Sequence, residues 1–118
     1  MASGKNPPLP GVDTDAGLRF AGMDAELYRA FLRQFPQDDS VLRLHDALER
    51  GDIADAFSCA HTLKGLSAQL GITRLAELAA EICDLLRAQK PEALPAARAR
   101  FIVLRRHHAQ IVRALGRL

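Results

Sequence analysis

Apolar residues recur along most of this chain at steps of three and four positions, the spacing that places them on one face of an α-helix. This pattern predicts six helices. They are expected over residues 13–20, 24–35, about 39–50, 52–70, from just after Gly71 to about Gln89, and in the C-terminal part of the chain. Pro91 and Pro95 leave the start of the last helix open.

Residues that start or stop helices mark several of these boundaries. Pro36 ends the second helix because proline lacks the N–H that a continuing helix needs. Gly51 and Gly71 follow the third and fourth helices, at a position where the left-handed conformation costs glycine little. Asp52 is expected to cap the fourth helix, where its side chain can accept a backbone hydrogen bond.

The last four helices are predicted to form the body of the protein. The connection at Gly71 is so short that the helices on either side of it must lie antiparallel. The final helix carries a bundle seam made by Phe101, Leu104, His108, Ile111, Leu115 and Leu118. No alternating run indicates a β-strand. The predicted fold class is therefore all-α: an antiparallel four-helix bundle with additional short N-terminal helices packed against it.

Composition limits the classes of function. The chain has 118 residues, enough for one domain, and its net charge of +2 does not by itself indicate nucleic-acid binding. No apolar run approaches the roughly 20 residues of a membrane-spanning helix. Residues 1–10, rich in Pro and Gly and without the apolar segment of a signal peptide, are interpreted as a linker or cloning remnant ahead of a domain over 11–118. We expect a monomeric, cytoplasmic domain that binds no nucleic acid and does not insert into a membrane.

The predicted fourth helix carries the candidate chemistry. Its core side is expected to hold Ala56, Ala60, Leu63 and Ser67, flanked by Ile53, Phe57 and Leu70. His61 lies about 120° from the centre of that side, so its ring should be exposed. The neighbours of His61 along its own stripe are all small: Ala54, Ser58, Gly65 and Ala68.

Small residues are unusual on an exposed helix surface, where Lys, Glu, Gln or Arg are common. Gly65 in mid-helix costs about 1 kcal/mol relative to alanine. We interpret the stripe, with Gln69 near its end, as a surface that a partner approaches closely. Imidazole is largely unprotonated and nucleophilic at neutral pH. Lys64, three residues after His61, can offer positive charge to phosphoryl oxygens.

The segment His61-Thr62-Leu63-Lys64-Gly65, followed by Gly71, resembles the H-x-L-K-G-x-x-x-x-x-G signature of histidine-containing phosphotransfer (HPt) domains. These are the relay modules of multistep two-component signalling. Residues 9–13, 26–28 and 51–52 are similar to HPt domains at the C-terminal end of hybrid sensor kinases. The resemblance covers most of the chain from Leu9.

The resemblance implies that His61 accepts a phosphoryl group, through its distal ring nitrogen, from a receiver-domain aspartate and passes it to another receiver domain. Lys64 would help to hold the group. The docking residues would be Ala54, Ser58, Gly65, Ala68 and Gln69. The partner's aspartate and bound Mg²⁺ would supply the catalytic machinery. This chain would then need no cofactor or metal of its own and would not be an autonomous enzyme.

One position departs from the family pattern. Some HPt domains orient the imidazole with a Gln or Glu on the next helix, 22 residues after the histidine, and here that position is Cys83. A thiol is a weak hydrogen-bonding partner. Either Glu81 or a water replaces it, or nothing orients the ring from that helix.

Two other classes of function compete with a phosphotransfer module. A sensor histidine kinase needs a nucleotide-binding domain with glycine-rich phosphate loops, and the sequence contains none. The second class is a helical interaction bundle that docks receiver domains without phosphotransfer; intact Lys64 and Gly65 argue against it. His45, His107 and His108 lack such surroundings. We interpret the arginines of the last helix as a solvated bundle face, and Cys59 and Cys83 as packing residues.

Overall fold

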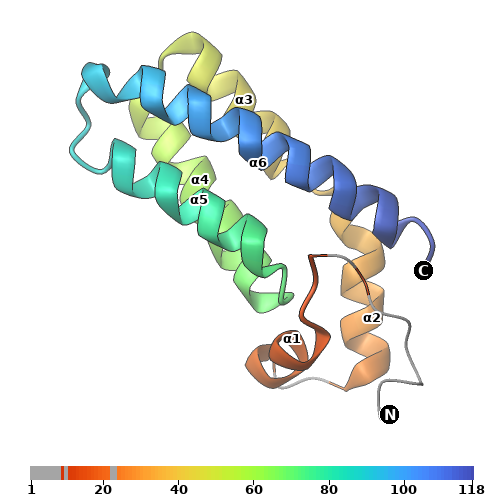
Figure 1. Cartoon of the computed structure of the whole chain (residues 1–118). Helices are drawn as coiled ribbons and strands as arrows, with labels where there is room; N and C mark the ends of the chain where they lie inside the picture. Colours follow the sequence, from red (N-terminus) through yellow and green to blue (C-terminus); the bar gives the residue numbers. More distant parts are fainter. Residues whose placement is uncertain (1–8, 10, 22–23) are drawn as a thin grey trace.

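The computed structural model describes residue 9 and residues 11–21 and 24–118, and these form an all-helical protein (Figure 1). The described part contains six α-helices and two short 3₁₀ turns. The α-helices are α1 (Thr14–Ala21), α2 (Ala25–Gln34), α3 (Ser40–Arg50), α4 (Ile53–Gln69), α5 (Thr73–Leu86) and α6 (Leu94–Leu115). The 3₁₀ turns are η2 (Phe35–Gln37) and η3 (Pro91–Ala93).

The last four helices close into the predicted antiparallel bundle. Helix α3 packs on α4, α4 on α5, α5 on α6, and α6 returns to α3. In Figure 1 the long α6 runs the length of the bundle, with α3 and α4 behind α6 and α5. Each helix contributes fully buried side chains to one core, among them Leu44, Leu48, Leu63, Leu75, Leu78, Ile82 and Leu104. The predicted fold class is confirmed.

Most helix ends lie where the sequence places them. The side chain of Asp52 accepts a hydrogen bond of 3.0 Å from the backbone N–H of Asp55 and caps α4. Gly51 and Gly71 have φ angles of 72° and 75°, in the left-handed region that glycine adopts at little cost. These three residues explain why α3, α4 and α5 can follow one another with only two or three residues between them.

The end of α5 differs from the prediction. This helix ends at Leu86 rather than about Gln89, and Gln89 itself has a φ of 58°. Leu86 is fully buried, whereas Leu85 is 37% exposed. Leu86 therefore belongs to the core, and Leu85 lies at its edge.

Helix α2 buries only part of its apolar stripe. Tyr28, Leu32 and Phe35 are buried, but Leu27 and Phe31 remain 48% and 44% exposed. Pro36 does not end the helical path at once, since the chain continues through the turn η2. Proline fits there because the first residues of a helical turn need no N–H donor.

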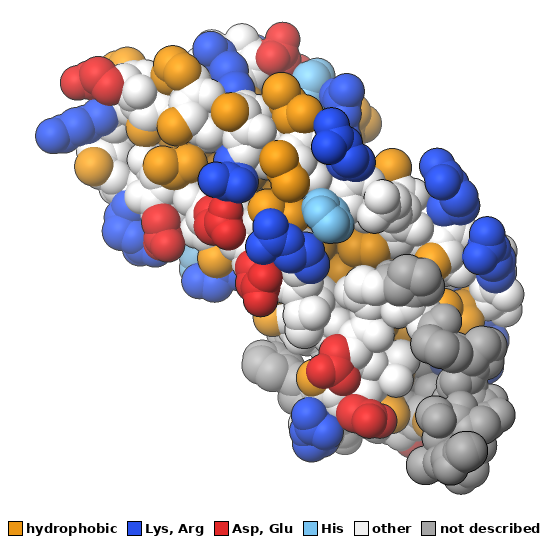
Figure 2. All heavy atoms as spheres, in the orientation of Figure 1, with side chains coloured by type: hydrophobic (Ala, Val, Ile, Leu, Met, Phe, Trp, Pro, Cys, Tyr) orange, Lys and Arg blue, Asp and Glu red, His pale blue; other side chains and the backbone are white. Residues whose placement is uncertain are grey.

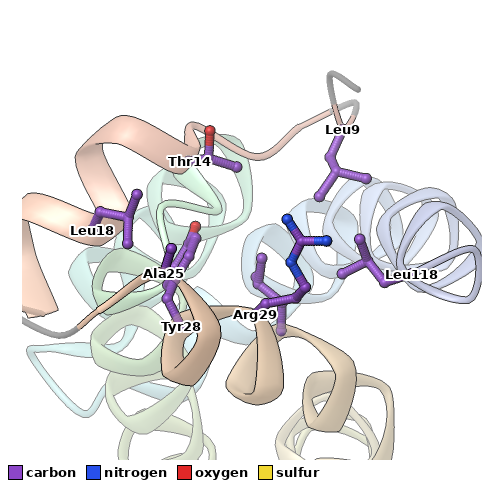
Figure 3. A pocket seen from close by; sticks show the side chains of 8 residues that line it. Leu9, Thr14, Leu18, Ala25, Tyr28, Arg29 and Leu118 are labelled. Carbon is purple, nitrogen blue, oxygen red and sulfur yellow. The ribbon is translucent and has the colours of Figure 1, made fainter. Parts of the chain in front are cut away.

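The two N-terminal helices attach to the turn between α4 and α5. The Tyr28 hydroxyl donates a hydrogen bond of 2.5 Å to the Leu70 carbonyl, and the Asp13 N–H donates one of 2.6 Å to the Gly71 carbonyl. A side chain at Gly17 would collide with the Tyr28 ring. A small apolar pocket remains where α1 and α2 meet the C-terminal residue (Figure 3), lined by Leu9, Thr14, Leu18, Ala25, Tyr28, Arg29, Leu32 and Leu118.

The predicted linker over residues 1–10 lies outside the described residues except for Leu9. Leu9 is partly buried against the core and accepts a hydrogen bond from the Val12 N–H. The division into a linker and a domain therefore stays a prediction. Among the described residues, no helix is both long and apolar enough to span a membrane.

Candidate functional site

Helix α4 presents its two sides as the sequence predicts. Ala56, Ala60, Leu63 and Ser67 are fully buried, and His61 on the other side is exposed. The arrangement follows from the register of α4, since its apolar residues fix the rotation of the helix against α3 and α5. The imidazole therefore stands at the surface of the bundle on a rigid element.

The surface around His61 is low and open. Ala54, Ser58, Gly65 and Gln69 are exposed, and Ala68 is half-buried. Among the residues that the structure describes, a Cβ atom built on Gly65 would meet nothing within 4 Å. Internal packing therefore does not require a glycine at position 65.

Lys64 adds a positive charge at the seam between α4 and α5. Its side chain is half-buried and forms no ion pair or hydrogen bond with any residue of the described ranges. Burial raises the pKa of the Cys83 thiol on α5, and the charges of Lys64 and Arg87 oppose that rise. Lys64 and Arg87 therefore both place positive charge near Cys83 of α5, the helix that packs against α4.

The His61 ring contacts an aromatic residue one turn earlier. The centroids of the Phe57 and His61 rings are 6.2 Å apart, and the ring planes are inclined by 29°, an offset stack. Within the described part of the chain, the His61 side chain accepts or donates no hydrogen bond. The sequence had placed Phe57 only as a neighbour of the core.

Cys83 and Glu81 on α5 were the residues considered as hydrogen-bond partners of the His61 imidazole, and both are engaged in other contacts. Cys83 is fully buried in the core cluster. Glu81 pairs with Arg100 of α6 at 3.0 Å and approaches Arg74 at 3.9 Å, so its carboxylate is engaged with these two arginines. The sequence left open whether Glu81, a water or no group on α5 orients the His61 ring. Its ion pairs with Arg100 and Arg74 argue against Glu81.

Arg87 at the end of α5 completes the surroundings of Phe57. Its guanidinium carbon lies over the Phe57 ring, 5.6 Å from the centroid, and its Nη2 pairs with Asp84 at 3.2 Å. Sequence reasoning missed both Phe57 and Arg87. The spacing of four residues between Phe57 and His61 is a signal that could have identified the first. Arg87 comes from another helix, and no sequence pattern indicates its place.

Two of the remaining three histidines contact aromatic rings. His45 lies against Phe101 with ring centroids 5.6 Å apart, and His108 meets the edge of Phe35 at 5.8 Å. His107 is half-buried on α6. Among the described residues, no group of three or more His, Cys, Asp or Glu side chains is placed to hold a metal ion.

Two arginines of α6 have partners elsewhere in the bundle. Figure 2 shows Lys and Arg side chains interspersed with Asp and Glu on the face drawn there. Arg98 donates hydrogen bonds of 3.0 and 2.7 Å to the Leu48 carbonyl at the end of α3, and Arg100 pairs with Glu81. Both arginines thus have structural partners within the bundle.

The fold and this surface define a class of protein: a helical bundle with an exposed histidine on one helix, flanked by a half-buried lysine and a stripe of small residues. The family model of the Hpt domain matches residues 26–115, which is most of the chain. The chain belongs to the Hpt domain family. Such domains are phosphotransfer modules of two-component phosphorelays that interact with receiver domains and have no autonomous catalytic activity. Searches of curated proteins and of solved structures returned no match.

Proposed function

We propose that His61 is the phosphoacceptor of this Hpt domain, taking a phosphoryl group from the aspartate of one receiver domain and delivering it to another. The observation that carries the proposal is the surface of α4, where the exposed His61 stands beside a Gly65 that has open space around it. A receiver domain has to bring its aspartate within bonding distance of the ring, and large side chains along the stripe would prevent that approach.

The nucleophile of the transfer is an unprotonated ring nitrogen of His61. Its lone pair forms the new N–P bond while the O–P bond of the aspartyl phosphate breaks, and the carboxylate keeps the electron pair. The second transfer reverses these roles on the next receiver domain. Lys64 has no ion-pair partner in the described ranges, and its charge stabilises the negative oxygens of the phosphoryl group during transfer.

The docking surface follows the stripe along α4. Ala54, Ser58, Gly65 and Gln69 are exposed and Ala68 half-buried, so a flat helix face of another domain can lie against them. We propose that the chain acts in the cytoplasm as the C-terminal module of a hybrid sensor kinase, because residues 9–13 and 26–28 are similar to the opening of such modules. A monomeric domain suffices for this role, since one α4 surface serves donor and acceptor in turn.

The test is phosphotransfer from a radiolabelled, phosphorylated receiver domain to the parent chain and to His61→Gln. We expect labelling of the parent that is acid-labile and alkali-stable, as a phosphoramidate is, and none of His61→Gln. His107→Gln, a half-buried histidine on α6, is the matched control and should label like the parent. Radiolabelled ATP alone should label none of the three.

Each other result has a definite meaning. Full labelling of His61→Gln would place the phosphoacceptor elsewhere. A parent chain that binds phosphorylated receiver domains without becoming labelled would support the alternative, a helical interaction bundle that docks receivers without phosphotransfer. Circular dichroism of His61→Gln should match the parent, because an exposed ring contributes little to the folded core.

A further inference from the structure

An exposed histidine is free to turn unless something holds its ring. The side chain has two rotatable bonds, and several staggered positions are open to it at a helix surface. Transfer of a phosphoryl group requires the attacking nitrogen to point along the line of the breaking bond, and small misplacements of reacting groups cost about a hundredfold in rate. The bundle therefore needs a device that limits the orientations of the His61 ring.

Hydrogen bonding does not supply that device in the described part of the chain. The His61 side chain has no hydrogen-bond partner there. The Cys83 thiol is enclosed in the core, and Glu81 is engaged with Arg100 and Arg74. The contact that the ring does make is the stack on Phe57, at 6.2 Å and 29°.

Phe57 is suited to this task because it is itself restrained. Its ring is half-buried and packs against the core cluster, so it cannot swing freely into solvent. The guanidinium of Arg87 lies over the ring at 5.6 Å, within the distance of a cation–π interaction. The pair of Arg87 with Asp84 limits the arginine in turn. A fixed aromatic face thus extends from the core to the imidazole.

We infer that Phe57 is a positioning residue for phosphotransfer: its ring holds the His61 imidazole in the attacking orientation, and Arg87 steadies Phe57 from α5. This inference rests on the proposed role of His61. Phe57 touches neither the phosphoryl group nor the partner's reacting atoms, and it acts only through the ring of His61. The coupling also ties the reactivity of α4 to the packing of α5.

The test compares Phe57→Leu, which keeps an apolar side chain but removes the aromatic face, with Phe57→Tyr, which keeps that face. Single-turnover transfer from a phosphorylated receiver domain gives the maximal rate and the half-saturating receiver concentration. We expect Phe57→Leu to lower the maximal rate about three- to tenfold, the factor that corresponds to one aromatic pair, with unchanged half-saturation. Phe57→Tyr should restore the parent rate.

A spectroscopic signature separates orientation from general stability. NMR three-bond couplings of the His61 side chain should indicate one dominant χ1 rotamer in the parent and in Phe57→Tyr, and rotamer averaging in Phe57→Leu. Arg87→Gln changes a side chain that is 61% exposed, so it tests the same coupling even if Phe57→Leu does not fold. We expect partial averaging and a rate about half that of the parent.

Several results would overturn the inference. They are an unchanged rate in Phe57→Leu, equal slowing in Phe57→Leu and Phe57→Tyr, a change confined to the half-saturating concentration, or couplings in Arg87→Gln identical to the parent. A parent that labels on a residue other than His61 would instead refute the proposed function. The two failures are thus distinguished by mapping the labelled residue of the parent chain.

Discussion

The hydroxyl group of Tyr28 on α2 donates a hydrogen bond to the carbonyl oxygen of Leu70, the residue that follows the last turn of α4. This bond crosses 42 positions of sequence and is buried. Helix α4 carries His61, and its carbonyl groups near Leu70 have no further helical turn to bond to. Tyr28 therefore supplies a hydrogen-bond donor to a carbonyl at the C-terminal end of α4. The same bond connects α2 to this end of the histidine helix.

Tyr28→Phe should destabilise the protein by about 1 to 2 kcal/mol, because the Leu70 carbonyl would lose its donor inside the protein. The ring would still fill the space that Gly17 leaves beside it. Urea denaturation followed by circular dichroism measures the change. Phosphotransfer at a temperature where both proteins are folded should be unaffected. A variant as stable as the parent would show that the bond contributes nothing net.

Ionisation of the Tyr28 hydroxyl should destabilise the folded protein at alkaline pH. Burial, with a smaller effect of the Asp13 charge, raises the pKa of Tyr28 from 10.0 to about 12. The folded protein therefore holds the proton more tightly than the unfolded chain does, and stability falls as the pH rises from about 10 to about 12. The chain has one tyrosine, so ultraviolet absorbance reports its ionisation directly. In Tyr28→Phe this part of the pH dependence should vanish.

His108 on α6 predicts a loss of stability in acid. Burial lowers its pKa from the ordinary 6.5, an effect that the nearby Asp38 charge partly opposes. Asp39, His45 and Arg105 line the same groove. The folded state favours the neutral ring, so stability should fall as the pH drops below about 6.5, where the unfolded chain takes up a proton.

The measurement is thermal unfolding of the parent and His108→Leu at pH 7.5 and pH 5. Leucine removes the titrating group and the buried Nε2, which has no hydrogen-bond partner among the described residues. We expect the variant to be at least as stable as the parent at pH 7.5 and to lose less stability at pH 5. Parallel losses in the two proteins would exclude His108 as the acid-sensitive group.

The fold could be predicted from the sequence where residues within or next to each helix determine its start and end. The apolar periodicity predicted the six helices of the described residues. Gly51, Asp52 and Gly71 indicated the end of α3 and both ends of α4, because capping is a local property. The end of α5 was placed wrongly because no glycine or proline stands between Leu86 and Gln89. Leu85 and Leu86 are the same residue type, and only the tertiary packing of the bundle decides that Leu86 enters the core.

The candidate site likewise has one part that the sequence predicts and one part that it does not. The exposure of His61 and the small stripe followed from the register of one helix, and the structure has both. The environment of the ring depends on how α5 lies against α4. That relation brings Arg87 over Phe57 and turns Glu81 toward Arg100, and it is a tertiary property that no local pattern encodes.

Lys64→Ala should slow phosphotransfer with little effect on folding. An exposed or half-exposed charge contributes at most about 1 kcal/mol to stability. Loss of a charge that stabilises a transition state can cost a hundredfold or more in an enclosed site, and we expect about tenfold for this partly solvated one. Lys90→Ala, an exposed lysine before η3, is the matched control. Rates equal to the parent in both variants would remove Lys64 from the mechanism.

The two glycines of the family motif have different physical roles. Gly71 has a φ of 75°, and a side chain there would collide with the carbonyl of Asp13. The backbone N–H of Asp13 donates a hydrogen bond to the Gly71 carbonyl, which keeps the two residues close together. Gly65 has an ordinary helical conformation and open space where a side chain would stand. Gly71 is therefore required by the fold, whereas no contact among the described residues requires a glycine at position 65.

Substitutions at the two positions should separate in stability and in activity. Gly71→Ala should destabilise the protein by more than 1 kcal/mol, through backbone strain and the collision with Asp13. Gly65→Ala should stabilise it by up to about 1 kcal/mol, because alanine suits a helix better. Gly65→Gln should remain folded and yet slow phosphotransfer by up to about a hundredfold, since its side chain keeps the receiver's aspartate away from His61. Thermal melts and transfer rates on the same samples measure both effects. If Gly65→Gln transfers at the parent rate, the partner does not approach along this stripe; if it unfolds, the glycine serves the helix and not the partner.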